Sequence, residues 1–307
     1  MARVRVLTEA QRIPGRAVTL AAQDLASRLP RMVLEARRVA ATLAHGIHGR
    51  RRAGPGETFW QFRPFSPGES AARIDWRRSA RDDRLYVRER EWEAAHSVHL
   101  WIDRSASMAY SSDLAMAPKV DRAIVLGLAL AEGFVEAGER VGLMGALPPR
   151  ASRRIAERFA EALADPRATS DADMPPVTAL GPQDETVIVS DFLSPAEEWG
   201  RCIEGIAGRG ARGHLLMIVD PVEETFPFSG QAVLEDVEGA TRLRIGDAGS
   251  WGAAYRTRIT AHRETLNDIA RRHGWTLTIH RTDRPASEAA LRLMTLVQAA
   301  RTGQAGG

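Results

Sequence analysis

From residue 97 onward, short apolar runs alternate with longer segments of helical period. The apolar runs cover residues 97–102, 140–146, 186–190, 213–220 and 275–280, and the helical segments cover 119–138, 152–164, 194–208, 255–273 and 287–301. Strands separated by helices of this length pair in parallel through right-handed crossovers. Because the runs are apolar throughout, both faces of each strand are expected to be covered. The pattern predicts a doubly wound α/β domain with a mostly parallel sheet over residues 97–302.

One segment within this region, at about residues 221–250, has no helical period. It carries turn signals at Ser229-Gly230 and Glu238-Gly239 and is predicted to form a small β insertion. The first 96 residues differ from both. Residues 24–45 are helix-like, whereas 58–65 and 84–91 read as strands within a Gly-, Arg- and aromatic-rich stretch. We expect a basic N-terminal extension over residues 1–96, helical and β-rich, whose segment 49–91 is part of the fold and not a detachable tail.

Charge is distributed unevenly along the chain. The net charge is +3, yet residues 1–100 hold 19 arginines against 11 acidic residues. A basic extension could meet an acidic partner or nucleic acid. The alternative is that arginine replaces lysine throughout, since Lys119 is the only lysine. We favour this second explanation for the arginine excess and keep the asymmetry as a feature of the chain.

Composition and short motifs exclude several classes. One cysteine cannot form an internal disulfide and fits a reducing compartment. The longest apolar run, 123–135, is about half a bilayer span, and the first residues lack the apolar region of a secretory signal, so we expect a soluble, cytoplasmic protein. Lys119 does not follow a Gly-rich turn, which argues against a P-loop ATPase. The sequence also lacks a G-x-S-x-G motif, which argues against an α/β-hydrolase.

Three oxygen-bearing side chains, Asp103, Ser105 and Ser107, directly follow the first predicted strand of this domain. In an open α/β sheet, ligands bind beyond the carboxyl ends of the strands. A hard divalent cation prefers oxygen ligands and keeps several waters, which this triplet would allow. The alternative is that the triplet only satisfies backbone amides in a turn or a helix cap. Asp191, at the end of the run 186–190, places a second carboxylate at the same sheet edge.

Together, Asp103-x-Ser105-x-Ser107 and Asp191 resemble the metal-ion-dependent adhesion site of the von Willebrand factor A fold. The resemblance implies Mg²⁺ or Mn²⁺ held directly by the two serines and mostly through water by the two aspartates. It also implies an open coordination position for a carboxylate of a partner protein. That family adds a threonine from another loop. No Gly-Thr occurs at the expected place, and the candidates are Ser152, Thr169 and Thr178.

The preceding basic segment, "GRRRAGPGETFWQFRPFSPGESAARIDWRRSAR" followed by "LYVRERE", resembles the bacterial domain-of-unknown-function-58 family. The resemblance covers about residues 45–300. It implies a partnership with a MoxR-type AAA+ ATPase in chaperone or complex-assembly work on a client protein. Within the segment, Arg73, Asp75, Trp76 and Arg81 are candidates for partner binding or for a structural Asp–Arg network.

Two hypotheses about function follow. The first is a non-enzymatic protein-interaction module that uses a divalent-metal adhesion site and assists a MoxR-type ATPase. The alternative is a metal-dependent phosphotransfer enzyme or nuclease with a basic arm that binds nucleic acid. Such chemistry usually requires several clustered carboxylates and a base. Two carboxylates with serine hydroxyls favour binding over catalysis, and we therefore expect neither enzymatic activity nor nucleic-acid binding.

Overall fold

The computed structural model describes residues 14–48, 59–66, 70–71, 74–81, 84–90, 96–165, 174–176, 180–182, 184–235 and 242–302. Two compact units divide the chain. The larger comprises residues 1–46 and 96–307, and the smaller comprises residues 47–95. The helix α1 (Pro14–His48), which lies within the predicted N-terminal extension, therefore belongs almost entirely to the same unit as the sheet.

The larger unit is built around a six-stranded sheet of order β10-β7-β6-β3-β4-β5. All neighbouring strands are parallel except β5, which runs antiparallel to β4. The strands are β3 (Ser97–Ile102), β4 (Arg140–Leu143), β5 (Leu147–Arg150), β6 (Glu185–Ser190), β7 (Arg212–Val219) and β10 (Thr276–Arg281). The predicted mostly parallel α/β sheet is confirmed.

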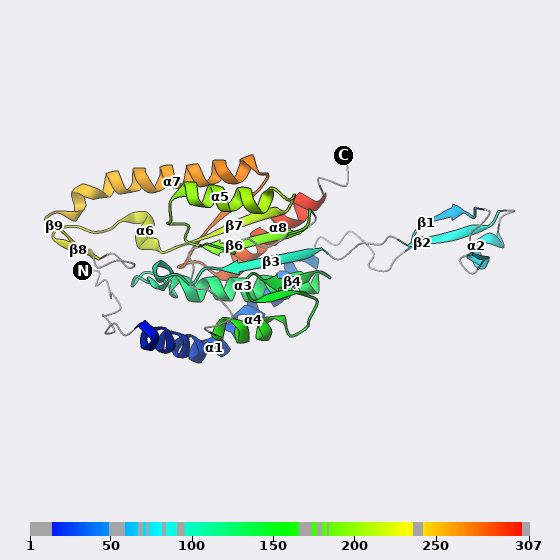
Figure 1. The fold of residues 1–307 in the computed structure, drawn as a ribbon, viewed down its shortest axis with the longest axis horizontal. Coiled ribbons are helices and arrows are strands. Elements are labelled where there is room, and N and C mark those ends of the chain that lie inside the picture. Colours follow the sequence, from blue (N-terminus) through cyan, green and yellow to red (C-terminus); the bar gives the residue numbers. More distant parts are fainter. Residues whose placement is uncertain are drawn as a thin grey trace. The chain divides into compact units, whose positions relative to one another are not determined.

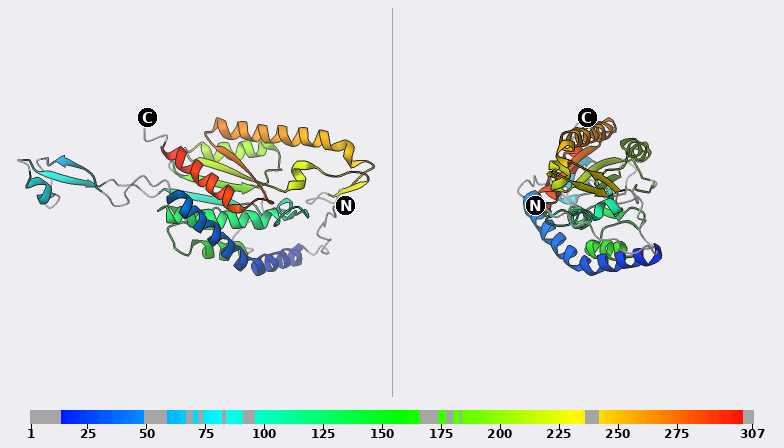
Figure 2. Two further views of the ribbon diagram at one scale, coloured as in Figure 1. Left: turned by 180° about the vertical axis from the view of Figure 1, so that it is seen from behind. Right: turned by 90° about the vertical axis from the view of Figure 1, so that its left-hand side faces the viewer.

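Helices flank this sheet on both faces (Figures 1 and 2). They are α3 (Lys119–Glu136), α4 (Ile155–Ala164), α5 (Ala196–Ala207), α6 (Pro221–Thr225), α7 (Gly252–Arg272) and α8 (Ala286–Thr302), with 3₁₀ turns η2 (Ala106–Ala109) and η3 (Ala248–Trp251). On one face, Trp199 and Ile203 of α5 and Leu266 of α7 form a buried core with Ile188 and Met217 of the sheet. The other face is covered by α3, α4 and α8. No described helix is long and apolar enough to cross a membrane.

The segment 221–250 was predicted to be a β insertion, whereas its first residues, Pro221–Thr225, form helix α6. Strand β5 is a second element that the sequence pattern did not predict. Its sequence, Leu-Pro-Pro-Arg, carries Pro148 and Pro149, and proline is confined to edge strands because it donates no ladder hydrogen bond. Gly142 of β4 lies so close to this strand that a Cβ atom would be 2.8 Å from the nitrogen of Pro149. A glycine here therefore permits the tight β4–β5 hairpin that ends the sheet.

Within the predicted β insertion, β8 (Ala232–Glu235) and β9 (Arg242–Ile245) form a two-stranded antiparallel sheet. The smaller unit contains a second such sheet, made of β1 (Phe59–Pro64) and β2 (Tyr86–Arg90), together with the short helix α2 (Trp76–Ser79). Both hairpins agree with the strand signals of the sequence.

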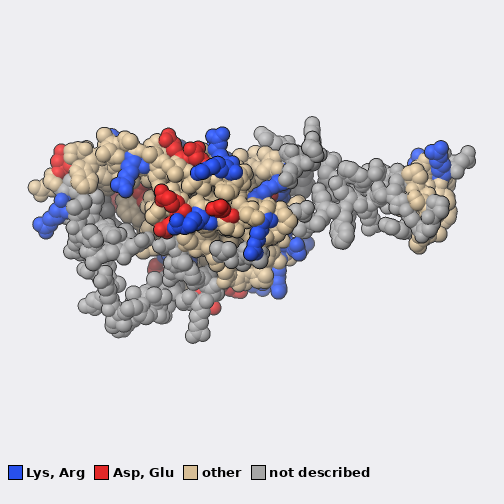
Figure 3. Space-filling view, turned by 45° about the horizontal axis from the view of Figure 1, so that its top comes forward, with Lys and Arg blue, Asp and Glu red and all other residues tan. Residues whose placement is uncertain are grey.

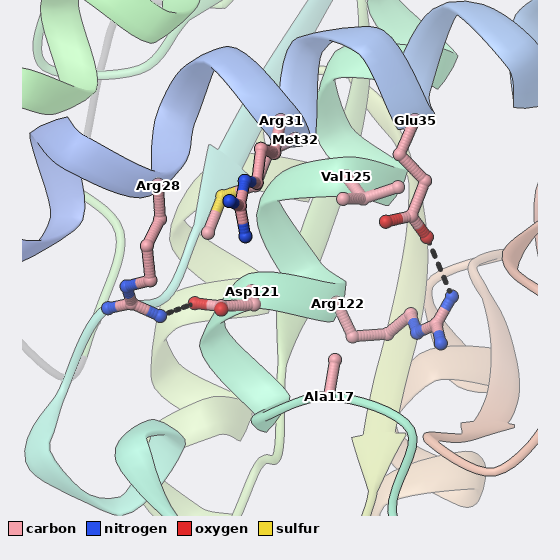
Figure 4. A pocket seen from close by; sticks show the side chains of 8 residues that line it. All are labelled: Arg28, Arg31, Met32, Glu35, Ala117, Asp121, Arg122 and Val125. Atoms are coloured by element: carbon pink, nitrogen blue, oxygen red, sulfur yellow. Dashed lines mark hydrogen bonds and ion pairs between the residues drawn. The ribbon is translucent and has the colours of Figure 1, made fainter.

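Helix α1 packs along α3 through an apolar face and ion pairs. Leu29, Met32, Ala36, Val39, Ala40 and Leu43 of α1 are buried. Arg28 pairs with Asp121 at the start of α3, and the Arg122 guanidinium lies 3.4 Å from the Glu35 carboxylate (Figure 4). The four charged residues of these ion pairs, together with Met32, line a cavity of about 190 Å³ between the two helices. Helix α1 thus adds an outer layer over the helix that leads to the candidate site.

Candidate functional site

The candidate site lies at the carboxyl ends of β3 and β6, which are adjacent parallel strands. Asp103 follows β3 and is 2% exposed. Its Oδ1 accepts a hydrogen bond from the Ser105 backbone N–H at 2.8 Å, and its Oδ2 accepts one from the Ser190 hydroxyl at 2.6 Å. Asp103 therefore joins the loop after β3 to the last residue of β6.

The two serines of the motif sit side by side. The hydroxyl oxygens of Ser105 and Ser107 are 3.1 Å apart. Ser105 stands at the N-cap of η2, yet its side chain makes no capping hydrogen bond. The Ser105 hydroxyl therefore does not cap the helix; Ser105 is 5% exposed, and its hydroxyl pairs with that of Ser107.

Asp191 follows β6 and is 4% exposed. Its Oδ1 accepts the Leu193 backbone N–H at 3.2 Å, and its Oδ2 accepts the Lys119 ammonium at 2.9 Å. The next residue, Phe192, has a positive φ of 55°, a conformation that costs a bulky residue of order 1–3 kcal/mol. Packing holds it there, because the Phe192 ring is fully buried with its centroid 4.5 Å from that of Trp199.

The sequence reasoning missed Lys119 as a site residue. The Lys119 side chain is 1% exposed at the start of α3, and its ammonium also donates to the Glu223 carboxylate of α6 at 2.6 Å. The second Glu223 oxygen accepts the Asp220 backbone N–H at 2.9 Å in a capping box that begins α6. One signal could have identified Lys119: it is the only lysine among 42 basic residues.

Burial dominates the electrostatics of these groups. Burial raises the pKa of Asp103 to about 6, against the hydrogen bonds from Ser190 and Ser105 that lower it. For Lys119, burial lowers the pKa, but Glu223 and Asp191 outweigh that effect and the pKa is raised. The ammonium is therefore a permanent positive charge beside Asp191.

The four residues predicted to hold Mg²⁺ or Mn²⁺ thus gather at one edge but divide into two halves. Asp103 and the Ser105–Ser107 hydroxyl pair provide oxygens of the type such an ion prefers. The Asp191 half does not fit a directly bound divalent ion, because the Lys119 ammonium, a cation of the protein itself, already lies 2.9 Å from one of its oxygens. Within the described residues, no three histidine, cysteine, aspartate or glutamate side chains gather in positions to bind one ion. Metal binding stays a prediction of the sequence.

The candidates for a third-loop ligand do not complete the site. Ser152 follows β5, whose last residue Arg150 pairs with Val141 at the beginning of β4. Ser152 therefore lies at the amino-terminal edge of the parallel strands, opposite Asp103, because β5 is antiparallel. Thr169 and Thr178 lie outside the described residues.

In the smaller unit, Asp75 acts as a helix cap. Its Oδ1 accepts the Arg78 backbone N–H at 2.9 Å at the start of α2, so the contact is to a backbone and not to a guanidinium. The Trp76 side chain is 63% exposed, and Arg81 is exposed. Arg73, the other predicted member, lies outside the described residues. The structure thus supports the structural interpretation for Asp75.

Apolar side chains flank the polar edge. Leu114 and Met116, in the loop between β3 and α3, are 54% and 67% exposed, and Leu193, in the loop after β6, is 46% exposed. Both loops leave the carboxyl ends of neighbouring strands, so the three side chains belong to the same edge as the serine pair. We call Leu114, Met116 and Leu193 the apolar rim.

The fold and site define a class of protein: an α/β domain with a cluster of polar side chains at the carboxyl ends of its parallel strands. The chain belongs to the family described as "Protein of unknown function DUF58", whose pattern matches residues 61–265. Uncharacterized proteins of Mycobacterium bovis and Mycobacterium tuberculosis are 28% identical to it over 280 residues, covering 85% of this chain and 86% of theirs.

Two solved structures show similarity to this chain. One is the conserved hypothetical protein BatB from Bacteroides thetaiotaomicron, with a TM-score of 0.43 and 15% identity, covering 67% of this chain and 100% of that one. The other is an aerotolerance-related membrane protein from Bacteroides fragilis, with a TM-score of 0.40 and 15% identity, covering 64% of this chain and 98% of that one.

Proposed function

We propose that this protein is a non-enzymatic interaction module that binds a partner protein at the carboxyl edge of its sheet, as von Willebrand factor A-like domains do. The observation that carries the proposal is the exposed apolar rim at the same sheet edge as the Ser105–Ser107 hydroxyl pair. Exposed large apolar side chains around a few hydrogen-bonding groups are the composition of a protein-binding surface.

The state of the carboxylates also supports binding over catalysis. A general base must lie within hydrogen-bond reach of the substrate proton that it removes. Both oxygens of Asp103 and of Asp191 accept hydrogen bonds from the protein itself. At 2% and 4% exposure, Asp103 and Asp191 hold the loops after β3 and β6 in position.

Surface charge on the visible face of the larger unit gives the nucleic-acid alternative little support there. On the face of the larger unit in Figure 3, acidic and basic side chains lie next to one another. Nucleic-acid binding depends on a basic patch or stripe. A MoxR-type AAA+ ATPase remains the partner that we propose, on the basis of the family resemblance.

The test compares two leucines of equal exposure. Leu114 of the apolar rim is 54% exposed, and Leu34 of α1 is 53% exposed. We expect Leu114→Glu to weaken the complex with the ATPase at least tenfold, about 1.4 kcal/mol, and Leu34→Glu to leave it unchanged. Isothermal titration with the purified ATPase of the same genome measures both. An equal effect of the two substitutions would move the interface away from the rim, and no complex with wild type would refute the partner.

A further inference from the structure

The buried cluster formed by Lys119, Asp191 and Glu223 links three elements that meet at the ligand edge. Lys119 comes from the first residue of α3, Asp191 from the loop after β6, and Glu223 from α6. The ammonium lies 2.9 Å from an Asp191 oxygen and 2.6 Å from a Glu223 oxygen. Two carboxylates and one ammonium leave the cluster one negative charge, which is far less costly to bury than two unpaired carboxylates.

The identity of the cation is unusual for this chain. Every other basic residue is arginine, and the single lysine occupies this position at 1% exposure. An ammonium is a compact point charge, whereas a guanidinium is a planar fork of five donors. The two carboxylates of the cluster therefore accept hydrogen bonds from a compact ammonium and not from a planar guanidinium. The Tyr110 ring, with its centroid 5.8 Å from the Lys119 nitrogen, borders the same space.

The cluster also pairs Asp191 with a cation of the protein itself. Its Oδ2 accepts from the ammonium, its Oδ1 accepts from the Leu193 N–H, and both Glu223 oxygens are similarly engaged. A divalent ion bound directly to Asp191 would lie only a few ångströms from the ammonium. Charges at such a separation repel strongly in a site shielded from water.

We propose that the Lys119 ammonium is the resident cation of this edge and holds Asp191 in the place of a divalent metal ion. The inference deepens the proposed function and rests on it for the location of the ligand edge. The ion pairs of Lys119 connect α3, the loop after β6 and α6, so this edge is assembled without a bound metal ion. Partner binding is then independent of divalent metal.

The single lysine permits a direct test on the wild-type, full-length protein. Lysine labelled with ¹³C at Cε and with ¹⁵N at Nζ gives one side-chain signal, that of Lys119. Titration of the metal-free protein with Mn²⁺, which broadens nearby signals, should leave the Lys119 signal sharp at equimolar metal. Broadening of that signal at equimolar Mn²⁺ would place a metal beside Lys119 and overturn the inference.

A charge-matched variant tests the converse. Lys119→Met together with Glu223→Gln removes one charge of each sign, so the cluster keeps its net charge while Asp191 loses its cation. We expect this variant to bind Mn²⁺ by isothermal titration at least tenfold more tightly than wild type. Adding Asp191→Asn as the control should abolish the gain. Equal Mn²⁺ affinity in wild type and the double variant would overturn the inference, whereas failure of partner binding in the Leu114 experiment would refute only the proposed function.

Discussion

At the scale of single residues, Asp103 shows what a buried carboxylate does to stability. The folded protein holds the Asp103 proton up to a pKa of about 6, whereas the ordinary value is 3.8. Between these values the folded state binds more protons than the unfolded state, so the free energy of unfolding falls as the pH rises. The difference between the two pKa values corresponds to about 3 kcal/mol.

Asp103→Asn should remove this penalty. Asparagine can still accept from the Ser105 N–H and can donate to the Ser190 oxygen, so the contacts are kept without the charge. Relative to wild type, the variant should gain up to about 3 kcal/mol of unfolding free energy as the pH rises from 4 to 6. Urea denaturation in metal-free buffer measures the difference.

Other groups that titrate in this range affect both proteins equally. Burial lowers the pKa of His214 and of His280 to about 4, so each contributes stability that is lost as the pH falls from 6.5 towards 4. This contribution cancels in the comparison. Asp113→Asn, at an exposed position, provides the control. Its unfolding free energy should change with pH in parallel with that of wild type. If the unfolding free energy of the Asp103→Asn variant also changed with pH in parallel with that of wild type, the prediction would be contradicted.

At the scale of elements, the contact between β7 and the beginning of β10 depends on a missing side chain. A Cβ atom on Gly213 of β7 would lie 2.2 Å from the indole ring of Trp275, which is 2% exposed. The Trp275 Nε1 donates to the Ala211 carbonyl at 3.3 Å, so the ring is held over the glycine. The strand thus accepts a large aromatic side chain directly on its backbone.

Gly213→Ala should therefore destabilise the larger unit by about 1–3 kcal/mol, because an added methyl group overpacks a rigid core. Gly205 is the matched control. It is exposed within α5, and nothing lies within 4 Å of its added Cβ atom. Gly205→Ala should stabilise the helix by up to about 1 kcal/mol. Urea midpoints distinguish the two. A Gly213→Ala midpoint equal to that of wild type would show that Trp275 does not cover this glycine.

At the scale of the whole molecule, the two units predict how the chain tolerates deletion. Residues 1–46 belong with residues 96–307, and α1 buries Leu29, Met32 and Leu43 in that unit. Residues 47–95 form a unit of their own. The boundary that matters for stability therefore falls after α1 and not at residue 96.

Replacing residues 47–95 by a flexible Gly/Ser linker of about twenty residues, which spans roughly 25 Å, should leave a cooperatively folding protein. Removing residues 1–96 should instead expose the apolar surface beneath α1 and give insoluble protein. Solubility and calorimetric melting check both. A soluble, cooperative 97–307 fragment would show that α1 is dispensable for the fold.

The sequence by itself determined the parallel strands of the sheet, most of its helices and the meeting of Asp103 and Asp191 at one sheet edge. Strands covered on both faces are apolar throughout, so β3, β6 and β7 were visible as short apolar runs. The carboxyl ends of parallel strands share one edge, so the sequence alone places Asp103 and Asp191 together. Strand β5 was not predicted, because it contains Pro148 and Pro149 and proline is rare in strands.

Only the tertiary structure decided what the site residues contact. Lys119 meets Asp191 and Glu223 from 72 and 104 residues away, and Arg28 meets Asp121 from 93 residues away. Such pairs depend on where crossovers return the chain and on which rotamers the packed core allows. Local periodicity reports which face of an element is buried, but it carries no information about which charged side chain lies opposite. For that physical reason the acidic half of the edge was predictable from the sequence and its cation was not.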